Sequence, residues 1–197
     1  MAVVVGLGNP GRRYRRTRHN VGFRVVEILA GRWHAEPEEA ARGARYRAWR
    51  AAPGGREVAL LEPRMFMNLS GEALLEWAGG SPPDPAQALI VCDDIYLPVG
   101  RLRLRRSGST GGHRGLESIE AALGTRDYPR LRIGVGAAAS GAAYREHVLA
   151  PPAPDEEDDV EVSLQRAADA VECWLLEGIQ QAMNRFNAKT TEEVKEE

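Results

Sequence analysis

Four polar residues that could act together on a substrate are spread over the first half of the chain. They are Asn9, His19, Asn68 and Asp93. A carboxylate behind a histidine orients the ring and stabilises the imidazolium that forms when the histidine takes a proton from water. An asparagine amide can hold a carbonyl group or donate a hydrogen bond to a developing oxyanion. The set predicts general-base hydrolysis, although each residue alone also fits an ordinary place in a turn or a helix cap.

Other catalytic chemistries lack the residues that they need. No serine occupies a G-x-S-x-G elbow, and Cys92 lies within a predicted strand, so the sequence indicates no covalent nucleophile. The four histidines are scattered along the chain without the spacing of metal ligands. The two cysteines form neither a disulfide framework nor a metal-spaced cluster. Attack by a water molecule under general-base catalysis is the chemistry that remains.

Residues 6–11, Gly-Leu-Gly-Asn-Pro-Gly, fit the G-x-G-x-x-G pattern of dinucleotide sites. In such a site a helix begins inside the glycines, so that its N-terminus meets the pyrophosphate. Here Pro10 and the polar residues up to His19 place the next predicted helix well beyond the glycines. No strand that ends in an acidic residue follows at the expected distance. The sequence therefore disfavours a dinucleotide-binding protein.

The hydrophobic pattern predicts the elements that must position these residues. Strands are expected at 2–7, 45–51, 56–62, 88–92, 101–105 and 131–135. Helices are expected after Asn20 as the N-cap, then at 71–78, 116–123 and 160–186. Strands that alternate with helices predict an α/β domain with a mostly parallel sheet covered on both faces. Ligands of such sheets sit at the carboxyl ends of the strands, where Asn9, Asp93 and the glycine-rich loop with His113 are expected.

Composition and charge narrow the class of protein. The chain has 197 residues, 43% of them hydrophobic, which suits one globular domain, predicted over 1–188 with a frayed acidic tail at 189–197. No apolar run approaches the ~18 residues of a membrane span, and no secretory signal is visible, so we expect a cytoplasmic protein. Residues 1–154 carry a net charge of +7 and residues 155–197 carry −9. The basic part suits a phosphate-bearing partner, although 24 of the 26 basic residues are arginines, which also fits a compositional habit.

The segment that follows the first predicted strand resembles the signature of a known protein family. Residues 6–23, GLGNPGRRYRRTRHNVGF, are similar to the N-terminal signature of the bacterial peptidyl-tRNA hydrolases. The resemblance continues in the family's order and spacing over nearly the whole chain. Its further blocks are PRMFMNLSG (63–71), CDDIYLPVG (92–100), RRSGSTGGHRG (105–115), YPRLRIGVG (128–136), REHVLAP and AMNRFN.

The resemblance implies a monomeric α/β globule with a twisted mixed sheet and helices on both faces, and no metal or cofactor. The implied reaction is hydrolysis of the ester that joins a peptide to the 3′ end of tRNA. The matched positions make His19 the catalytic histidine and Asp93 the carboxylate that orients it. The resemblance also implies a set of residues that bind the substrate or the tRNA: Asn9, Tyr14, Met67, Asn68, Arg105, His113, Arg114 and Arg132.

The sequence departs from the family's pattern at two places. Arg114 stands where many members have asparagine, so this arginine either contacts the tRNA or pairs with an internal acid such as Asp94. Two alanines, Ala137 and Ala138, follow Gly136 where a basic residue and a proline are expected. A non-catalytic RNA-binding relative is the alternative function. The presence of all four polar residues disfavours it, because an inactive descendant has no chemical need for them.

Overall fold

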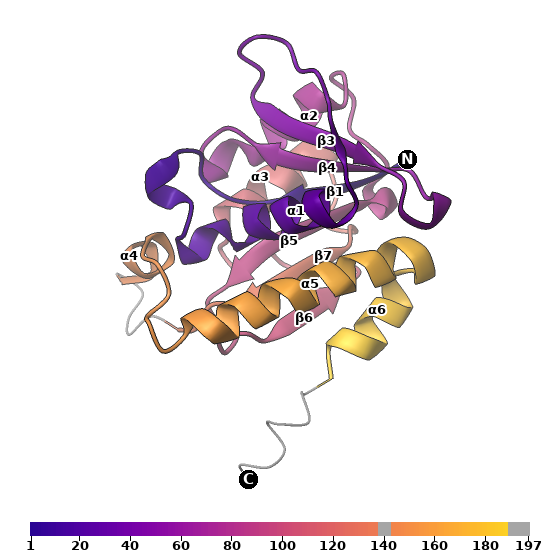
Figure 1. Cartoon of the computed structure of the whole chain (residues 1–197). Helices are drawn as coiled ribbons and strands as arrows, with labels where there is room; N and C mark the ends of the chain where they lie inside the picture. The colour runs from indigo at the N-terminus through magenta and orange to yellow at the C-terminus, as the bar shows by residue number, and fades with distance from the viewer. Residues whose placement is uncertain (138–142, 189–197) are drawn as a thin grey trace.

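The computed structural model describes residues 1–137 and 143–188, and its centre is a seven-stranded sheet (Figure 1). The strand order is β2-β3-β4-β1-β5-β7-β6. The strands are β1 (Ala2–Gly6), β2 (Glu36–Pro37), β3 (Tyr46–Ala51), β4 (Val58–Pro63), β5 (Ala88–Asp94), β6 (Leu102–Arg105) and β7 (Arg130–Gly134). The predicted α/β fold with a mixed, mostly parallel sheet is confirmed, and the predicted tail at 189–197 lies outside the described residues.

The central strands run in parallel and end at one edge of the sheet. Strand β1 pairs in parallel with β4 on one side and β5 on the other, and β5 pairs in parallel with β7. Strands β3 and β6 are antiparallel to their neighbours. The apolar runs of β1 and β5 are buried along their whole length because helices cover both faces of the sheet. The carboxyl ends of β1, β4, β5 and β7 therefore lie together.

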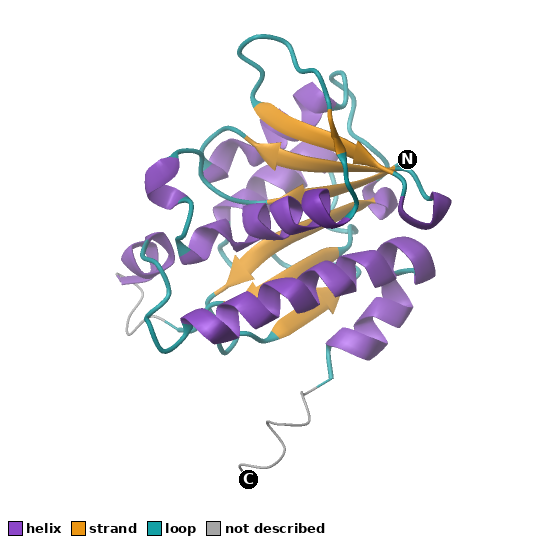
Figure 2. Cartoon of the chain, viewed as in Figure 1, coloured by secondary structure: helices purple, strands orange, loops and turns teal. Residues whose placement is uncertain are grey.

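Helices form one layer on each face of this sheet (Figure 2). One face packs against α1 (Val21–Arg32) and α5 (Glu157–Glu177), and the other against α2 (Ser70–Trp77) and α3 (Arg114–Leu123). Helix α6 (Ile179–Phe186) packs on α5 and β6, and the short α4 (Tyr144–Leu149) lies beside the turn at 18–20. Among the described residues, no helix is both long and apolar enough to span a membrane.

The glycines at the start of the chain allow close contact between α1 and β1. A Cβ atom added to Gly6 would lie 2.3 Å from the carbonyl oxygen of Gly22 in α1. A Cβ atom added to Gly8 would lie 2.7 Å from the ring of Phe23. Helix α1 starts at Val21, well after the glycines. Packing between helix and sheet therefore accounts for the first two glycines of the G-x-G-x-x-G pattern, and the third, Gly11, adopts a φ of 109° in the turn that follows.

Several predicted boundaries differ from those of the structure. The helix expected at 160–186 is two helices, because Gly178 adopts a φ of 90° between α5 and α6. Strand β5 extends past residue 92, so Asp93 and Asp94 belong to the strand itself. Residues 12–20 were expected as a loop up to the helix cap, and they contain two 3₁₀ turns, Arg12–Tyr14 and Arg18–Asn20. The sequence did not predict β2 or α4, which are too short for a periodic pattern.

Candidate active site

A cleft of about 700 Å³ opens at the carboxyl edge of the parallel strands. Its walls come from the turn after β1, the turn at 18–20, the end of β5, the glycine-rich loop before α3, and α4. Seven of the predicted site residues line it: Asn9, Tyr14, His19, Met67, Asn68, Asp93 and His113, together with Arg114 and Arg132 from the predicted tRNA-binding set. The parallel arrangement of β1 and β5 places the two loops that follow these strands on the same side.

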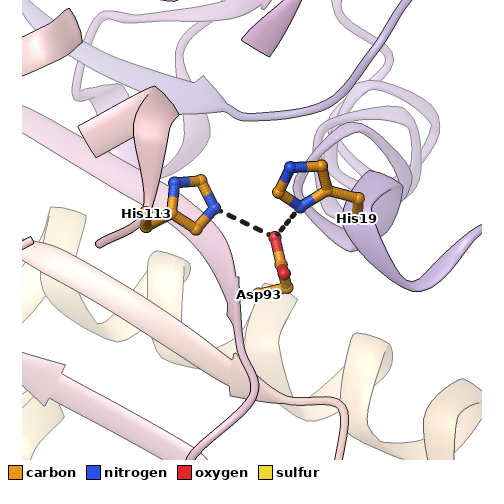
Figure 3. A group of neighbouring side chains, drawn as sticks. All are labelled: His19, Asp93 and His113. Carbon is orange, nitrogen blue, oxygen red and sulfur yellow. Dashed lines mark hydrogen bonds and ion pairs between the residues drawn. The ribbon is translucent and has the colours of Figure 1, made fainter. Parts of the chain in front are cut away.

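One carboxylate oxygen joins two histidines that line this cleft (Figure 3). The Nδ1 atom of His19 lies 2.7 Å from Oδ1 of Asp93, and Nε2 of His113 lies 3.0 Å from the same oxygen. The side chain of Asp93 is 2% exposed and that of His19 is 15% exposed. The carboxylate is thus shielded from water, while the ring of His19 still reaches the cleft.

The two histidines determine the charge state of Asp93. Burial alone would raise the pKa of this carboxyl group, but the charges and hydrogen bonds of His19 and His113 outweigh burial and hold the pKa well below its usual range. Burial would lower the pKa of His19, yet the nearby carboxylate of Asp93 raises it above its ordinary value. Asp93 is therefore an anion that stabilises the protonated form of His19.

Hydrogen bonds define the tautomer of His113. Its Nδ1 atom accepts hydrogen bonds from the backbone N–H groups of Gly115 and Leu116 at 3.1 and 3.3 Å, and so caps the N-terminus of α3. Because Nδ1 accepts, Nε2 carries the ring proton, and its N–H group donates a hydrogen bond to Asp93. His19 donates through Nδ1, which leaves its Nε2 atom as a proton acceptor in the cleft.

The four histidines are scattered along the sequence, but the fold brings His19 and His113 together at Asp93. Ligand atoms of His19, Asp93 and His113 lie within 4.8 Å of one another, as in a metal site. The nitrogen atoms that point toward Asp93 hold protons in the network above, so these three groups are satisfied by each other. Sequence spacing alone could not show that the three groups meet, because they come from a turn, a strand and a loop that only the fold brings together.

Asn9 is locked into the wall of the cleft by its neighbours. Its backbone N–H donates to Oδ1 of Asn20, and its carbonyl oxygen accepts from Nδ2 of Asn20, both at 2.9 Å. Its own Oδ1 accepts the backbone N–H of Met67 at 2.9 Å. The amide N–H₂ group of Asn9 is therefore the part left to donate to a substrate. Asn20 precedes α1 as predicted, but its side chain holds Asn9 and does not cap the helix.

Asn68, Met67 and Tyr14 complete the polar and apolar lining near the histidines. Asn68 lies in the turn Met67–Leu69 and is exposed toward the cleft. Met67 is buried, and its sulfur fills the space beside Gly115, where a Cβ atom would lie only 2.5 Å away. The guanidinium of Arg13 lies over the ring of Tyr14, with its Cζ atom 4.5 Å from the ring centroid.

The three predicted tRNA-binding arginines have different surroundings. Arg105 is exposed on β6 and is not among the described residues that line the cleft. Arg114 is exposed at the cleft, and across residues 1–137 and 143–188 it makes no hydrogen bond or ion pair. Arg132 is only 11% exposed and pairs with Asp94 at 3.2 Å. The sequence-based alternative that Arg114 pairs with Asp94 is therefore not what the structure shows, and Ala137 is exposed where a basic residue was expected.

Sequence reasoning missed several cleft residues, most of them aromatic or basic. Phe66 and Tyr96 are 55% and 62% exposed, and the rings of Tyr96 and Tyr144 meet edge to face at 6.3 Å. The available signal was position: Phe66 and Tyr96 lie within the matched blocks 63–71 and 92–100, and Tyr144 directly precedes the block REHVLAP. The missed lining residues are Arg13, Phe66, Ile95, Tyr96, Tyr144, Arg145, Val148 and Leu149.

At the carboxyl edge of an α/β sheet, an open cleft with a carboxylate-backed histidine can perform the general-base chemistry of a hydrolase. Comparison with known proteins agrees with this class. The sequence profile of the family described as peptidyl-tRNA hydrolase matches residues 3–195. The chain belongs to the peptidyl-tRNA hydrolase family, and the predicted enzyme class, a hydrolase, is confirmed.

Similar proteins support the assignment along the whole chain. The peptidyl-tRNA hydrolase of Symbiobacterium thermophilum is 45% identical over 185 residues, which cover 94% of this chain and 98% of that protein. The peptidyl-tRNA hydrolase of Chloroflexus aurantiacus is 45% identical over 195 residues, covering 95% and 99%. The crystal structure of peptidyl-tRNA hydrolase from Acinetobacter baumannii superposes with a TM-score of 0.87 at 32% identity, covering 96% of each chain.

Proposed function

We propose that this protein hydrolyses the ester bond between a peptide and the 3′ end of tRNA, with His19 as the general base. The observation that carries the proposal is the 2.7 Å contact between His19 Nδ1 and Asp93 Oδ1 in an open cleft. The names of the relatives supply the substrate class. Such a substrate arises during translation, so the predicted cytoplasmic location stays consistent with the proposal.

His19 takes the proton of the attacking water. Its Nε2 atom accepts this proton while Nδ1–H remains bonded to Asp93, and the carboxylate stabilises the imidazolium that results. The oxygen of the water forms a bond to the ester carbonyl carbon, and a tetrahedral intermediate results. When this intermediate collapses, the bond to the ribose 3′ oxygen breaks, and His19 returns its proton to that oxygen. The products are the free peptide acid and a tRNA with an intact 3′ hydroxyl group.

The two asparagines stabilise the charge that develops on the carbonyl oxygen. The amide N–H₂ of Asn9 is available because its oxygen is bonded to Met67. The side chain of Asn68 is exposed in the same cleft and can donate from the adjoining turn. An amide that is held rigidly toward a developing oxyanion lowers the barrier because it needs no reorganisation. Tyr14 and Met67 shape the surface against which the substrate lies.

His113 acts on the same centre through Asp93. Its Nε2–H donates to the oxygen that also accepts from His19, so it keeps the carboxylate ionised and oriented. All the groups that this mechanism uses come from one chain, so the mechanism requires no partner subunit, and the monomer stays a prediction. The mechanism also needs no metal ion or cofactor.

The tRNA contacts the basic surface around the cleft. Arg114 lies at the N-terminus of α3, where a cation is disfavoured by up to ~1 kcal/mol and a phosphate would offset this effect. Arg105 extends the basic surface along β6. Contacts of this kind add affinity that falls with salt concentration, because bound phosphates release counterions. Arg132 was predicted for the same role, and its guanidinium also donates to Asp94 and to the carbonyl oxygen of Ser109.

One assay separates this function from non-catalytic RNA binding. The protein is incubated with an N-acetyl-aminoacyl-tRNA and, in parallel, with the free aminoacyl-tRNA, and ester loss is followed from each. We expect rapid loss from the acetylated substrate only. Absence of ester loss together with tight tRNA binding would favour the non-catalytic alternative. The same assay with EDTA, under conditions that keep the tRNA folded, should give an unchanged rate; loss of activity would point to a metal at His19, Asp93 and His113.

A further inference from the structure

The 3₁₀ turn Arg18–Asn20, called the catalytic turn below, is anchored on both sides of His19. On one side, the side chain of Asn20 exchanges two hydrogen bonds with the backbone of Asn9. On the other side, Arg18 is not among the described residues that line the cleft, and its side chain is only 7% exposed. A guanidinium that leaves water needs partners inside the protein, because an unpaired buried charge is strongly destabilising.

The side chain of Arg18 binds two segments that lie far along the chain. Its Nη1 atom donates to the carbonyl oxygen of Val135, which directly follows β7, at 2.9 Å. Its Nη2 atom donates to Oε2 of Glu156 at 2.5 Å, and this hydrogen bond holds the pKa of the carboxyl group below its usual range. Glu156 directly precedes α5. Arg18 therefore joins the catalytic turn to the end of β7 and to the start of α5.

The carbonyl group of Val135 also anchors the wall of the cleft that α4 forms. The Nε2 atom of His147 in α4 lies 3.1 Å from this carbonyl oxygen and 2.9 Å from that of Gly136, so its N–H group donates toward both. The backbone N–H of Arg18 donates to the carbonyl oxygen of Ala150, which follows α4, at 3.0 Å. The catalytic turn and the α4 wall are thus held at one point of the fold.

The position of the catalytic turn determines the contact between His19 and Asp93. Asp93 belongs to β5 in the sheet, whereas His19 belongs to the turn, so their 2.7 Å contact depends on how the turn is held against the sheet. The backbone N–H of Val135 donates to the carbonyl oxygen of Asp94 at 3.1 Å. The residue that accepts from Arg18 is therefore bonded to the immediate neighbour of Asp93.

We propose that Arg18 is a positioning residue for the hydrolysis, which holds the catalytic turn so that His19 keeps its contact with Asp93. The proposal rests on the proposed function. Arg18 acts on the reaction through the turn alone, because its nitrogen atoms are directed to Val135 and Glu156. A turn anchored on one side only would allow the ring of His19 to shift, and a shift of about 1 Å can lower a rate on the order of 10²-fold.

The test compares Arg18→Lys with the control Arg24→Ala. Arg24 also forms an ion pair with α5, through Glu161, but it belongs to α1 and lies beyond the catalytic turn. A lysine keeps the charge of Arg18, but its single nitrogen does not match the two acceptors that the guanidinium fork reaches. We expect Arg18→Lys to lower kcat by about 10- to 100-fold, with KM and its salt dependence nearly unchanged. Arg24→Ala should keep wild-type kinetics in the same assay with N-acetyl-aminoacyl-tRNA.

A pH profile and a proton resonance separate positioning from a purely structural role. Burial would lower the pKa of His19, and the carboxylate of Asp93 raises it above its ordinary value, so a weaker contact lowers this pKa. Because His19 must be neutral to accept a proton, the acidic limb of the kcat/KM profile should move to lower pH in Arg18→Lys. The Nδ1–H proton resonance of His19 should shift or broaden in this variant and stay unchanged in Arg24→Ala.

Two results would overturn the proposal. A folded Arg18→Lys protein with wild-type kcat, pH profile and His19 resonance would leave Arg18 with a role in stability alone. A variant that only raises KM and flattens the salt dependence would make Arg18 a contact of the RNA.

Thermal melts show whether each variant is folded. If Arg18→Lys does not fold, Glu156→Ala decides, because it removes one of the two acceptors and should cause the same changes to a smaller degree. A folded Glu156→Ala protein with wild-type kcat and pH profile would then overturn the proposal. If the wild-type protein hydrolyses no ester, the proposed function fails, and the His19 resonance still decides whether Arg18 positions the turn.

Discussion

Two buried carboxylates near the ends of parallel strands have pKa values that shift in opposite directions. Asp93 is the last residue but one of β5, and Glu62 is the last but one of β4. The two strands lie on either side of β1, and each of the two side chains is 2% exposed. Burial would raise the pKa of both groups. At Asp93 the two histidines overcome burial and lower the pKa, whereas burial raises the pKa of Glu62 to about 7.

The difference lies in the partners that each carboxylate has. Asp93 accepts from two ring nitrogens that are themselves largely shielded from water. Glu62 has Arg47 as its partner, but that side chain is 44% exposed, and the nearby carboxylate of Glu27 repels the charge. The comparison teaches that enclosed donors, and not burial alone, decide which buried acid is an anion at neutral pH.

The largest expected effect on the rate of hydrolysis comes from the substitution of His19, one of the two histidines that contact Asp93. We expect His19→Ala to lower kcat by about 10²- to 10⁴-fold, the usual contribution of a general base, because no other group in the proposed mechanism accepts the proton of the water. Single-turnover hydrolysis of an N-acetyl-aminoacyl-tRNA measures the loss, and a thermal melt shows that the variant is folded. A folded variant with a near-native rate would remove His19 from the mechanism.

A smaller loss is expected from Asp93→Asn. The amide can still accept from a ring nitrogen through its oxygen, but it removes the negative charge that raises the pKa of His19. Burial then lowers that pKa, so the acidic limb of the kcat/KM profile should move to lower pH while the maximal rate falls. A loss greater than that of His19→Ala would reverse the roles of the two residues.

Glu62→Gln tests the other side of the comparison through stability. The folded-state pKa of Glu62, about 7, lies above its ordinary value of 4.5, so the folded protein binds the proton more tightly and loses stability as pH rises from about 4.5 to 7. The glutamine variant lacks this loss, and at pH 8 its free energy of unfolding should exceed that of the wild type by on the order of 2 kcal/mol. Urea unfolding at pH 5 and pH 8 measures the difference.

The exposed Glu57, just before β4, provides the matched control for that experiment. We expect Glu57→Gln to change the stability equally little at both pH values. If Glu62→Gln were less stable than the wild type at pH 8, the ion pair with Arg47 would outweigh the effect of burial, and Glu62 would resemble Asp93 after all.

The smallest effect on the rate of hydrolysis is expected from substitutions of Arg114, which is exposed at the cleft. Arg114→Asn should keep measurable hydrolysis and flatten the salt dependence of tRNA binding by about one charge, while Arg114→Glu should weaken binding more strongly. Filter binding over a salt titration measures both. Arg56→Glu, an exposed arginine at the opposite end of β4, serves as the control. Equal affinities of the wild type and both Arg114 variants at every salt concentration would leave Arg114 without a role in tRNA binding.

Much of the fold and of the site was predictable from local patterns. Apolar runs such as residues 2–7 and 88–92 predicted the central strands, because period and length are properties of a segment itself. The order of strands and polar loops then placed Asn9, His19 and Asp93 at one edge of the sheet, and the cleft contains all three. Boundaries were less predictable, since Gly178 divides a helix whose apolar pattern runs on past it.

The sequence by itself determined the α/β class, the family blocks and the set of polar residues at the strand ends. Only the tertiary structure decided that His113 and His19 share one oxygen of Asp93, across 20 and 74 residues of chain respectively. It also decided that Arg132 faces the glycine-rich loop and that Glu62 meets an exposed arginine and a second acid. The physical reason is that charge state depends on distance and on access to water, and both arise from contacts between segments far apart in sequence.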